Sequence, residues 1–245
     1  MKIVNAVYRI NTIDMRDVNE NMEEIIGKIG KYITDIRRTN ADSKAPLNIP
    51  RLICSDTSKH FNIVVTDQSI EIQAMNAEKL DDDIILDKMV ELVDHIGTYF
   101  EDYSDAPFNF CGFSIQTKVA TEEISENPTD YVSDRIQGFG SNLLVDNAMI
   151  RKCFIQGDYY INLTMRNDKQ MRVSAPKQGA KPTKIEVTDE FMIFEVDVND
   201  KYAFLNKPEY ECEIEQAIGI AQDVAGFYRE KALNFVQTGE FDYFK

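Results

Sequence analysis

Residues 61–100 read FNIVVTDQSIEIQAMNAEKLDDDIILDKMVELVDHIGTYF, and they contain two strand patterns followed by a helix pattern. In the second strand pattern Ile70, Ile72 and Ala74 alternate with polar residues, which is the period of a strand with one buried face. From residue 85 onward the apolar residues recur three or four positions apart, which is the period of an amphipathic helix. The polar residues between the two strands favour a turn. This stretch therefore predicts an antiparallel hairpin that is followed by a helix.

Three consecutive aspartates, Asp81, Asp82 and Asp83, open this predicted helix of residues 79–100, and Asp87 follows one turn later. Successive helical residues point about 100° apart, so three in a row cannot all face one ion. The first turn of a helix offers unpaired N–H groups and the positive end of the helix dipole, and both favour carboxylates. We therefore expect Asp81 or Asp82 to cap the helix, Asp83 and Asp87 to lie on its wet face, and no metal site to form here.

The two halves of the chain repeat one order of patterns. The first half contains a strand, an amphipathic helix, three strands and a helix, at residues 2–10, 19–38, 51–55, 61–66, 69–75 and 79–100. The second half contains a strand, a short helix opened by Pro128, three strands and a long helix, at residues 107–120, 127–140, 149–155, 159–166, 170–175 and 209–237. We predict an α+β fold in which an antiparallel sheet carries amphipathic helices on one face. It would be a tandem β-α-β-β-β-α pseudo-repeat with units 1–104 and 105–245 that form one compact body.

The second predicted unit departs from the first in two ways. Residues 183–200, TKIEVTDEFMIFEVDVND, predict an inserted hairpin before the long last helix. That helix, opened by Pro208 and the glutamates after it, contains Gly219 and Gly226. A glycine inside a helix costs about 1 kcal/mol relative to alanine, so we expect these two to permit close contact with a strand.

The composition excludes several classes of protein. The chain has 42 acidic and 27 basic residues and a formal net charge of −15, so repulsion from phosphates disfavours direct nucleic-acid binding. No apolar run reaches the ~18 residues of a membrane span, and the N-terminal stretch lacks a signal-peptide cleavage site. Cys54, Cys111, Cys153 and Cys212 form no CxxC pair, which excludes the usual zinc spacings. We therefore expect a cytoplasmic protein with reduced thiols.

Catalytic signatures are missing from the sequence. Its two histidines, His60 and His95, lie in no Ser/His/Asp or Cys/His pattern, and the HExxH, Walker A, GxSxG and EF-hand patterns do not occur. The glycines of residues 136–142 follow a helix pattern and lack the lysine of a phosphate loop, so they predict a helix end. We expect no catalytic residues, no metal and no cofactor, and hence a protein that is not an enzyme.

Glu195, Asp197 and Asn199 are the candidate partner-binding residues. They alternate with apolar residues in one predicted strand, so their side chains share a face, with successive ones about 7 Å apart. A row of oxygen side chains suits a positively charged partner, although it is also typical of a strand face in water.

Three functions remain open. The first is a non-catalytic interaction protein that binds another protein, or itself, through an acidic face or a sheet edge. A composition rich in Ile, Asn and Lys suggests an AT-rich bacterial or phage genome, where such a protein would act as an inhibitor or sensor in phage–host conflict. The second is an acidic nucleic-acid mimic that blocks a DNA- or RNA-binding enzyme. The third is a small-ligand binder in which Tyr159, Tyr160 or His95 orients a ligand in a cavity between the sheet and the long helix.

Overall fold

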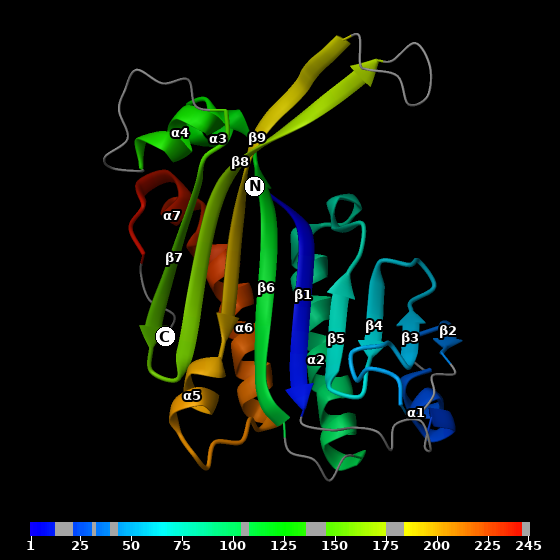
Figure 1. The fold of residues 1–245 in the computed structure, drawn as a ribbon. Coiled ribbons are helices and arrows are strands. Elements are labelled where there is room, and N and C mark those ends of the chain that lie inside the picture. The colour runs from blue at the N-terminus through cyan, green and yellow to red at the C-terminus, as the bar shows by residue number, and fades with distance from the viewer. Residues whose placement is uncertain are drawn as a thin grey trace.

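The strands form one antiparallel sheet in a computed structural model of the chain, which describes residues 1–12, 22–30, 33–39, 44–103, 108–135, 146–174 and 184–241. The sheet has nine strands in the order β2-β3-β4-β5-β1-β6-β9-β8-β7 (Figure 1). Their bounds are β1 (Lys2–Thr12), β2 (Asp35–Arg38), β3 (Leu52–Ser55), β4 (Phe61–Val65), β5 (Ser69–Ala74), β6 (Phe108–Val119), β7 (Met149–Gln156), β8 (Tyr159–Ser174) and β9 (Lys184–Asn199).

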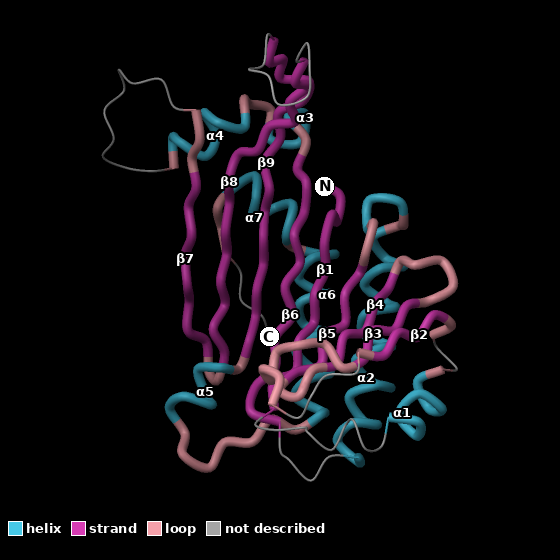
Figure 2. Tube along the Cα trace, turned by 45° about the vertical axis from the view of Figure 1, so that its right-hand side comes forward, coloured by secondary structure: helices cyan, strands magenta, loops and turns pink. Residues whose placement is uncertain are grey.

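The long helices lie against one face of the sheet. The helical elements are α1 (Met22–Ile29), the 3₁₀ turn η2 (Ala77–Lys79), α2 (Asp82–Tyr103), α3 (Thr121–Ile124), α4 (Pro128–Asp134), α5 (Lys201–Asn206), α6 (Ile214–Glu230) and α7 (Ala232–Thr238). Figures 1 and 2 show α2 and α6 side by side behind the sheet, with α7 beyond α6. We call the other face of the sheet the open face. The predicted α+β class, with an antiparallel sheet and helices on one face, is confirmed.

The core lies between the sheet and these helices, and the strand period places it there. In β5 Ile70, Ile72 and Ala74 are buried while the polar residues between them are half-buried. In the centre of the sheet the rings of Tyr8 and Phe113 lie 5.7 Å apart, and the Tyr8 hydroxyl donates to a carbonyl of α6 at 2.8 Å. Alternation of apolar and polar residues therefore fixes which face of each strand meets the helices.

The aspartates that precede α2 form a helix start. The Asp81 carboxylate accepts a hydrogen bond from the Asp83 N–H at 3.0 Å, so Asp81 caps the helix. Asp83 and Asp87 are exposed, and both bind Arg229 of α6. Asp82 does more than the sequence predicted, because it accepts the Tyr228 hydroxyl at 2.7 Å and forms an ion pair with Lys2. These bonds join α2 to α6 and to β1.

Two predicted helices are shorter than the sequence pattern indicated. Residues 19–38 were expected to form one helix, but α1 ends at Ile29 and residues 35–38 form β2, which pairs with β3. The last helix was expected over 209–237, yet α6 begins at Ile214 and the helix breaks at Lys231. The chain before α6 is held to the sheet instead, since the Cys212 N–H donates to the Phe108 carbonyl at 2.9 Å. In both places pairing with a strand wins over local helix propensity.

The predicted inserted hairpin is also corrected. Residues 184–199 form the single strand β9, and the two predicted strands of residues 159–175 are one strand, β8. The expected close contact of Gly219 and Gly226 with a strand is also wrong, because a Cβ at either glycine would meet nothing within 4 Å. The close contact lies at Gly97 of α2, where a Cβ would overlap Cδ1 of Ile214 and come within 3.3 Å of its Cγ1.

The strand order places the two halves on opposite sides of a central pair. β1 and β6 pair with each other, β5, β4 and β3 continue on the side of β1, and β9, β8 and β7 continue on the side of β6. The descent of both halves from one duplicated unit stays a prediction, which superposition of residues 1–104 on 105–245 would test.

Candidate functional site

A two-stranded arm projects beyond the sheet where β8 and β9 extend past the other strands (Figure 1). We define the arm as residues 170–174 and 184–188. Met171 lies opposite Val187 and Val173 lies opposite Ile185, so four apolar side chains share one face. Each of the four is between 52 and 61% exposed. Side chains of this size are usually buried, so the described part of the chain leaves this face uncovered.

A β-bulge marks the point where the arm leaves the sheet. Gln170 pairs with Asp189 and Met171 pairs with Val187, which leaves Thr188 as the extra residue. The Thr188 hydroxyl donates to the Gln170 carbonyl at 3.1 Å. A bulge bends the strand and increases its twist, and it shifts the register by one residue. The shift therefore places Val187 and Ile185 of β9 on the same face as Met171 and Val173 of β8.

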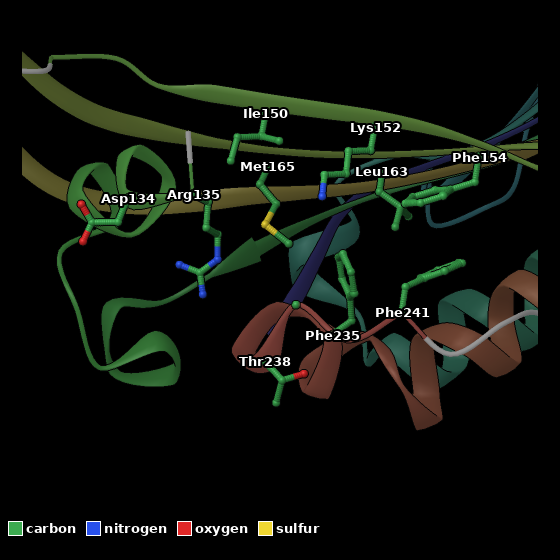
Figure 3. Close-up of a pocket in the computed structure, with 11 residues that line it drawn as sticks. Asp134, Arg135, Ile150, Lys152, Phe154, Leu163, Met165, Phe235, Thr238 and Phe241 are labelled. Atoms are coloured by element: carbon green, nitrogen blue, oxygen red, sulfur yellow. The ribbon is translucent and has the colours of Figure 1, made fainter. Parts of the chain in front are cut away.

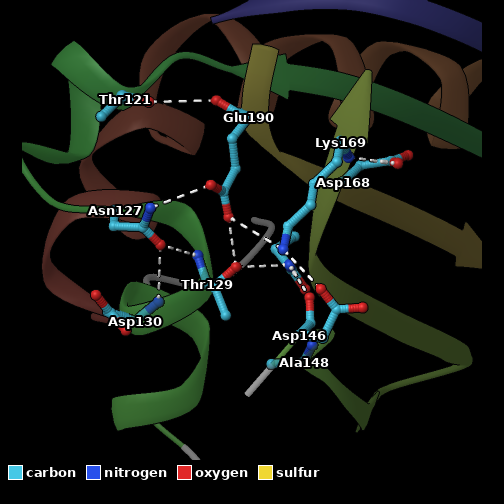
Figure 4. Close-up of polar contacts among 10 residues, drawn as sticks. Thr121, Asn127, Thr129, Asp130, Asp146, Ala148, Asp168, Lys169 and Glu190 are labelled. Atoms are coloured by element: carbon cyan, nitrogen blue, oxygen red, sulfur yellow. Dashed lines mark hydrogen bonds and ion pairs between the residues drawn. The ribbon is translucent and has the colours of Figure 1, made fainter. Parts of the chain in front are cut away.

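A polar network holds the base of the arm (Figure 4). The Glu190 carboxylate of β9 accepts the Thr129 hydroxyl of α4 at 2.5 Å and the Asn127 amide at 3.2 Å. The buried Asn167 amide of β8 donates to the Thr129 hydroxyl oxygen at 2.7 Å, and the Lys169 ammonium lies 4.0 Å from Glu190. The network joins β8, β9 and α4, so it fixes the direction in which the arm leaves the sheet.

Strand β7 forms one edge of the described sheet, where its one partner strand is β8. Met149 and Ile155 are exposed on it, and Met149, the first residue of β7, pairs with Arg166 of β8. Arg151 and Lys152 are also exposed. Charged residues on an edge strand limit unwanted strand pairing, so this edge is accessible to a partner but protected against indiscriminate association.

The structure places Glu195, Asp197 and Asn199 on the open face of β9, where all three are half-buried. The Glu195 carboxylate accepts the Gln116 amide at 3.0 Å, and the Asp197 carboxylate accepts the Asn199 amide at 2.7 Å. Gly112 of β6 lies opposite Asn199, and a Cβ there would come within 2.7 Å of the Asn199 Cβ. These residues therefore form a small acidic patch that is surrounded by amide side chains, with a glycine that leaves room for it.

Tyr159, Tyr160 and His95 do not line one cavity. Tyr159 and Tyr160 are successive strand residues, so their side chains point to opposite faces of the sheet. The Tyr159 hydroxyl accepts the Gln216 amide of α6 at 3.4 Å, whereas the Tyr160 ring packs edge-on against Tyr202. His95 is exposed on α2. The structure thus separates this predicted ligand set.

Sequence reasoning missed a buried cluster of Cys111, Asp200, Cys212 and Tyr210. The two Sγ atoms lie 3.3 Å apart, although the cysteines are 101 residues apart in the chain. The Asp200 carboxylate accepts the Cys111 N–H at 2.7 Å and the Tyr210 hydroxyl at 2.6 Å. No local pattern signals the cluster, because β6 supplies one member and the segments around α5 supply the others.

The two thiols and the Asp200 carboxylate are the described residues whose spacing would suit a metal ion. Burial raises the pKa of Asp200, while its hydrogen bonds act in the opposite direction. The hydrogen bond to Cys111 and burial raise the pKa of the Cys212 thiol. A metal ion would have to displace the thiol protons, because thiolates are the form that metals bind. The contacts therefore describe a carboxyl group held by hydrogen-bond donors, which joins β6 to the segment before α6.

A pocket of about 530 Å³ lies between the β7–β8 pair and the end of α7 (Figure 3). Its apolar wall consists of Ile150, Phe154, Leu163, Met165, Phe235 and Phe241. The rings of Phe154 and Phe241 are stacked with centroids 5.2 Å apart. Arg135 and Lys152 bring two cationic groups to the same pocket. This volume is in the range of pockets that bind small molecules.

The search for relatives gives no family. No protein-family model matches this chain, and no curated protein matches it in sequence. Within the part of the chain that the structure describes, none of the helices combines the length and apolar character needed to cross a membrane. Any functional assignment therefore rests on the arm, the sheet edge, the acidic patch and the pocket.

Proposed function

We propose that this chain is a non-catalytic interaction protein that binds another protein through the apolar face of the arm and the adjoining edge of the sheet. The observation that carries the proposal is the exposure of Met171, Val173, Ile185 and Val187 in two directly opposed pairs. Contiguous apolar surface rimmed by polar residues is typical of interaction sites. The other face of the arm pairs Arg172 with Glu186, so only one face is apolar.

The energetics require a contact larger than the arm alone. Full burial of one such side chain contributes about 1.5–3 kcal/mol, so burying four that are half-exposed contributes roughly 3–6 kcal/mol. Association costs about 4–15 kcal/mol in lost freedom of motion. The free edge of β7 supplies the additional contact, because an edge strand offers main-chain hydrogen bonds to a partner strand.

The acidity of the chain bears on the kind of partner. A formal net charge of −15 favours a partner with a basic surface, since complementary charge accelerates association. Together with the composition, this supports a cytoplasmic role in a bacterium or phage, as an inhibitor or sensor in phage–host conflict. Glu195, Asp197 and Asn199 are the residues through which the open face would contact basic groups of such a partner.

The test compares two variants of the arm. The arm variant Val173→Thr/Ile185→Thr removes two opposed apolar side chains but keeps β-branched residues, which strands tolerate. The control Arg172→Thr/Glu186→Thr changes the opposed pair on the other face of the same arm. Affinity capture from the native host, followed by binding to the purified partner, should give the same partner for the wild type and the control and lose it for the arm variant. Retention of the partner by the arm variant, or no partner above background, contradicts the proposal.

A nucleic-acid mimic predicts a different result in the same experiment. Its partner would be a DNA- or RNA-binding enzyme, and binding would weaken steeply with salt. The arm variant would then bind normally, while Glu195→Gln/Asp197→Asn would lose binding. The structure favours the arm over this alternative, because Arg9 and Lys118 form ion pairs with Glu71 and Asp189 along the sheet and so interrupt any row of unpaired carboxylates.

A further inference from the structure

The pocket between β7–β8 and α7 combines an apolar wall with cationic groups at one side. Ile150, Lys152 and Phe154 alternate along β7, so all three point to the helix side of the sheet. Neighbouring β8 contributes Leu163 and Met165. Lys152 is exposed at this edge of the sheet, and its ammonium group points toward the space beside α7 in Figure 3.

The cations differ in how they are held. The Arg135 guanidinium stacks 3.4 Å from the centroid of the Tyr131 ring and donates to the Tyr131 carbonyl at 2.8 Å. These contacts fix Arg135 beside the pocket. Lys152 has no hydrogen bond or ion pair to any of the residues that the structure describes. Its charge is therefore available to a ligand.

We propose that this pocket binds an amphipathic monoanion, with its apolar body against Phe154, Leu163 and Phe235 and its negative head at Lys152 and Arg135. Charge complementarity determines the head group, because among the described residues two cations and one carboxylate, that of Asp134, line the pocket. The stacked rings of Phe154 and Phe241 and the side chain of Met165 form an apolar surface for an alkyl chain or an aromatic ring. β7 contributes to both this pocket and the proposed edge contact, but the arm does not line the pocket, so the arm variant tests protein binding independently of this site.

The experiment uses dodecanoate as the probe and isothermal titration calorimetry on the purified full chain. We expect saturable binding at one site with a Kd on the order of 100 µM or tighter, which a ligand of about fourteen heavy atoms reaches at ordinary ligand efficiency. Dodecanol tests the apolar body alone and should bind more weakly, and dodecyltrimethylammonium should bind least. A long-chain aryl carboxylate, measured in parallel, distinguishes an alkyl ligand from an aromatic one.

The chain offers a matched control for the charge. Lys152→Glu reverses the charge inside the pocket, whereas Arg151→Glu makes the same change on the next residue, whose side chain points to the open face. We expect Lys152→Glu to weaken dodecanoate binding about tenfold, since attraction becomes repulsion, and Arg151→Glu to leave it within about twofold. Ile150→Trp should block the pocket although both cations remain. Lys152→Gln provides a second test of the charge if Lys152→Glu does not fold.

Three results would overturn the proposal. One is the absence of saturable dodecanoate binding to the wild type. Another is equal loss of binding in Lys152→Glu and Arg151→Glu, which would show a response to net charge and not to this site. The third is equal affinity for the anionic, neutral and cationic probes, which would show nonspecific apolar adsorption.

Discussion

Gly97 of α2 is the point where the two long helices approach most closely among the described glycines, and we expect Gly97→Ala to destabilise the protein. A Cβ added there would overlap Cδ1 of Ile214, lie 3.3 Å from its Cγ1 and lie 3.6 Å from Cδ1 of Ile10. Ile214 is 5% exposed, so its side chain must find another rotamer inside a closed core. Overpacking of this kind costs about 1–3 kcal/mol.

Alanine in a helix also gains about 1 kcal/mol over glycine, which partly offsets the overpacking. The net effect of Gly97→Ala is therefore a loss of about 0–2 kcal/mol of unfolding free energy. Gly219→Ala isolates the helix-propensity gain, because a Cβ at Gly219 would meet nothing within 4 Å. We expect Gly219→Ala to stabilise the protein by about 1 kcal/mol. The two variants should thus differ by the overpacking cost alone.

Urea unfolding followed by circular dichroism measures this difference through the midpoints of the two variants. Adding Ile214→Val to Gly97→Ala removes Cδ1, the atom that the new Cβ would overlap. Alone, Ile214→Val should cost about 0.5–1.5 kcal/mol, but in the Gly97→Ala background it should cost less or nothing. If Gly97→Ala raised the midpoint as much as Gly219→Ala, the close helix contact would be refuted.

Three further predictions concern charged groups. Arg51→Met should lower the free energy of unfolding by about 3–5 kcal/mol, because it leaves the buried Asp67 carboxylate without the guanidinium that donates to it at 3.0 and 2.5 Å. The double variant Arg51→Met/Asp67→Leu should recover most of that loss in urea unfolding. Burial raises the pKa of Asp200, so its carboxyl group binds a proton more tightly in the folded state than in the unfolded chain. The contribution of Asp200 to the free energy of unfolding therefore falls as pH rises above about 3.9. The stability of the wild type relative to Asp200→Asn should therefore decrease between pH 4 and 7, and a constant or increasing difference contradicts the raised pKa. Arg229→Ala should cost about 1 kcal/mol or less, since its bonds to Asp83 and Asp87 are exposed, and the loss should shrink in about 1 M salt when unfolding is measured by heating.

The sheet and its helices could be predicted because their periods are long and regular. β6 alternates buried and half-buried residues from Phe110 to Val119, and α2 buries a helical stripe from Ile85 to Ile96. β2 could not be predicted, because it is 4 residues long and Ile36 also fits the helical spacing that begins in α1. Only its pairing with Ser55–Leu52 of β3 makes it a strand, and that contact is not local.

The candidate sites also differ in whether the sequence could predict them. The period of β7 alone places Lys152 on the same face as Ile150 and Phe154, so sequence reasoning could have found this cation. The cluster of Cys111 and Cys212 could not be found, because the residues meet only after β6 and the segment before α6 have packed. Tyr159 and Tyr160 could not both orient a ligand in the predicted cavity, because successive strand residues point to opposite faces.

The arm is the main support for the proposed interaction function. In an arm without a partner, Val173 and Ile185 would add no stability to the strand pair, because polar β-branched residues form an exposed strand pair equally well. The chain distinguishes the two arm faces, since Arg172 and Glu186 occupy the side opposite the apolar pairs. The bulge at Thr188 shifts the register so that Val187 and Ile185 meet Met171 and Val173 on one face. Four exposed apolar side chains in this arrangement promote aggregation, and a protein partner that covers them would prevent it.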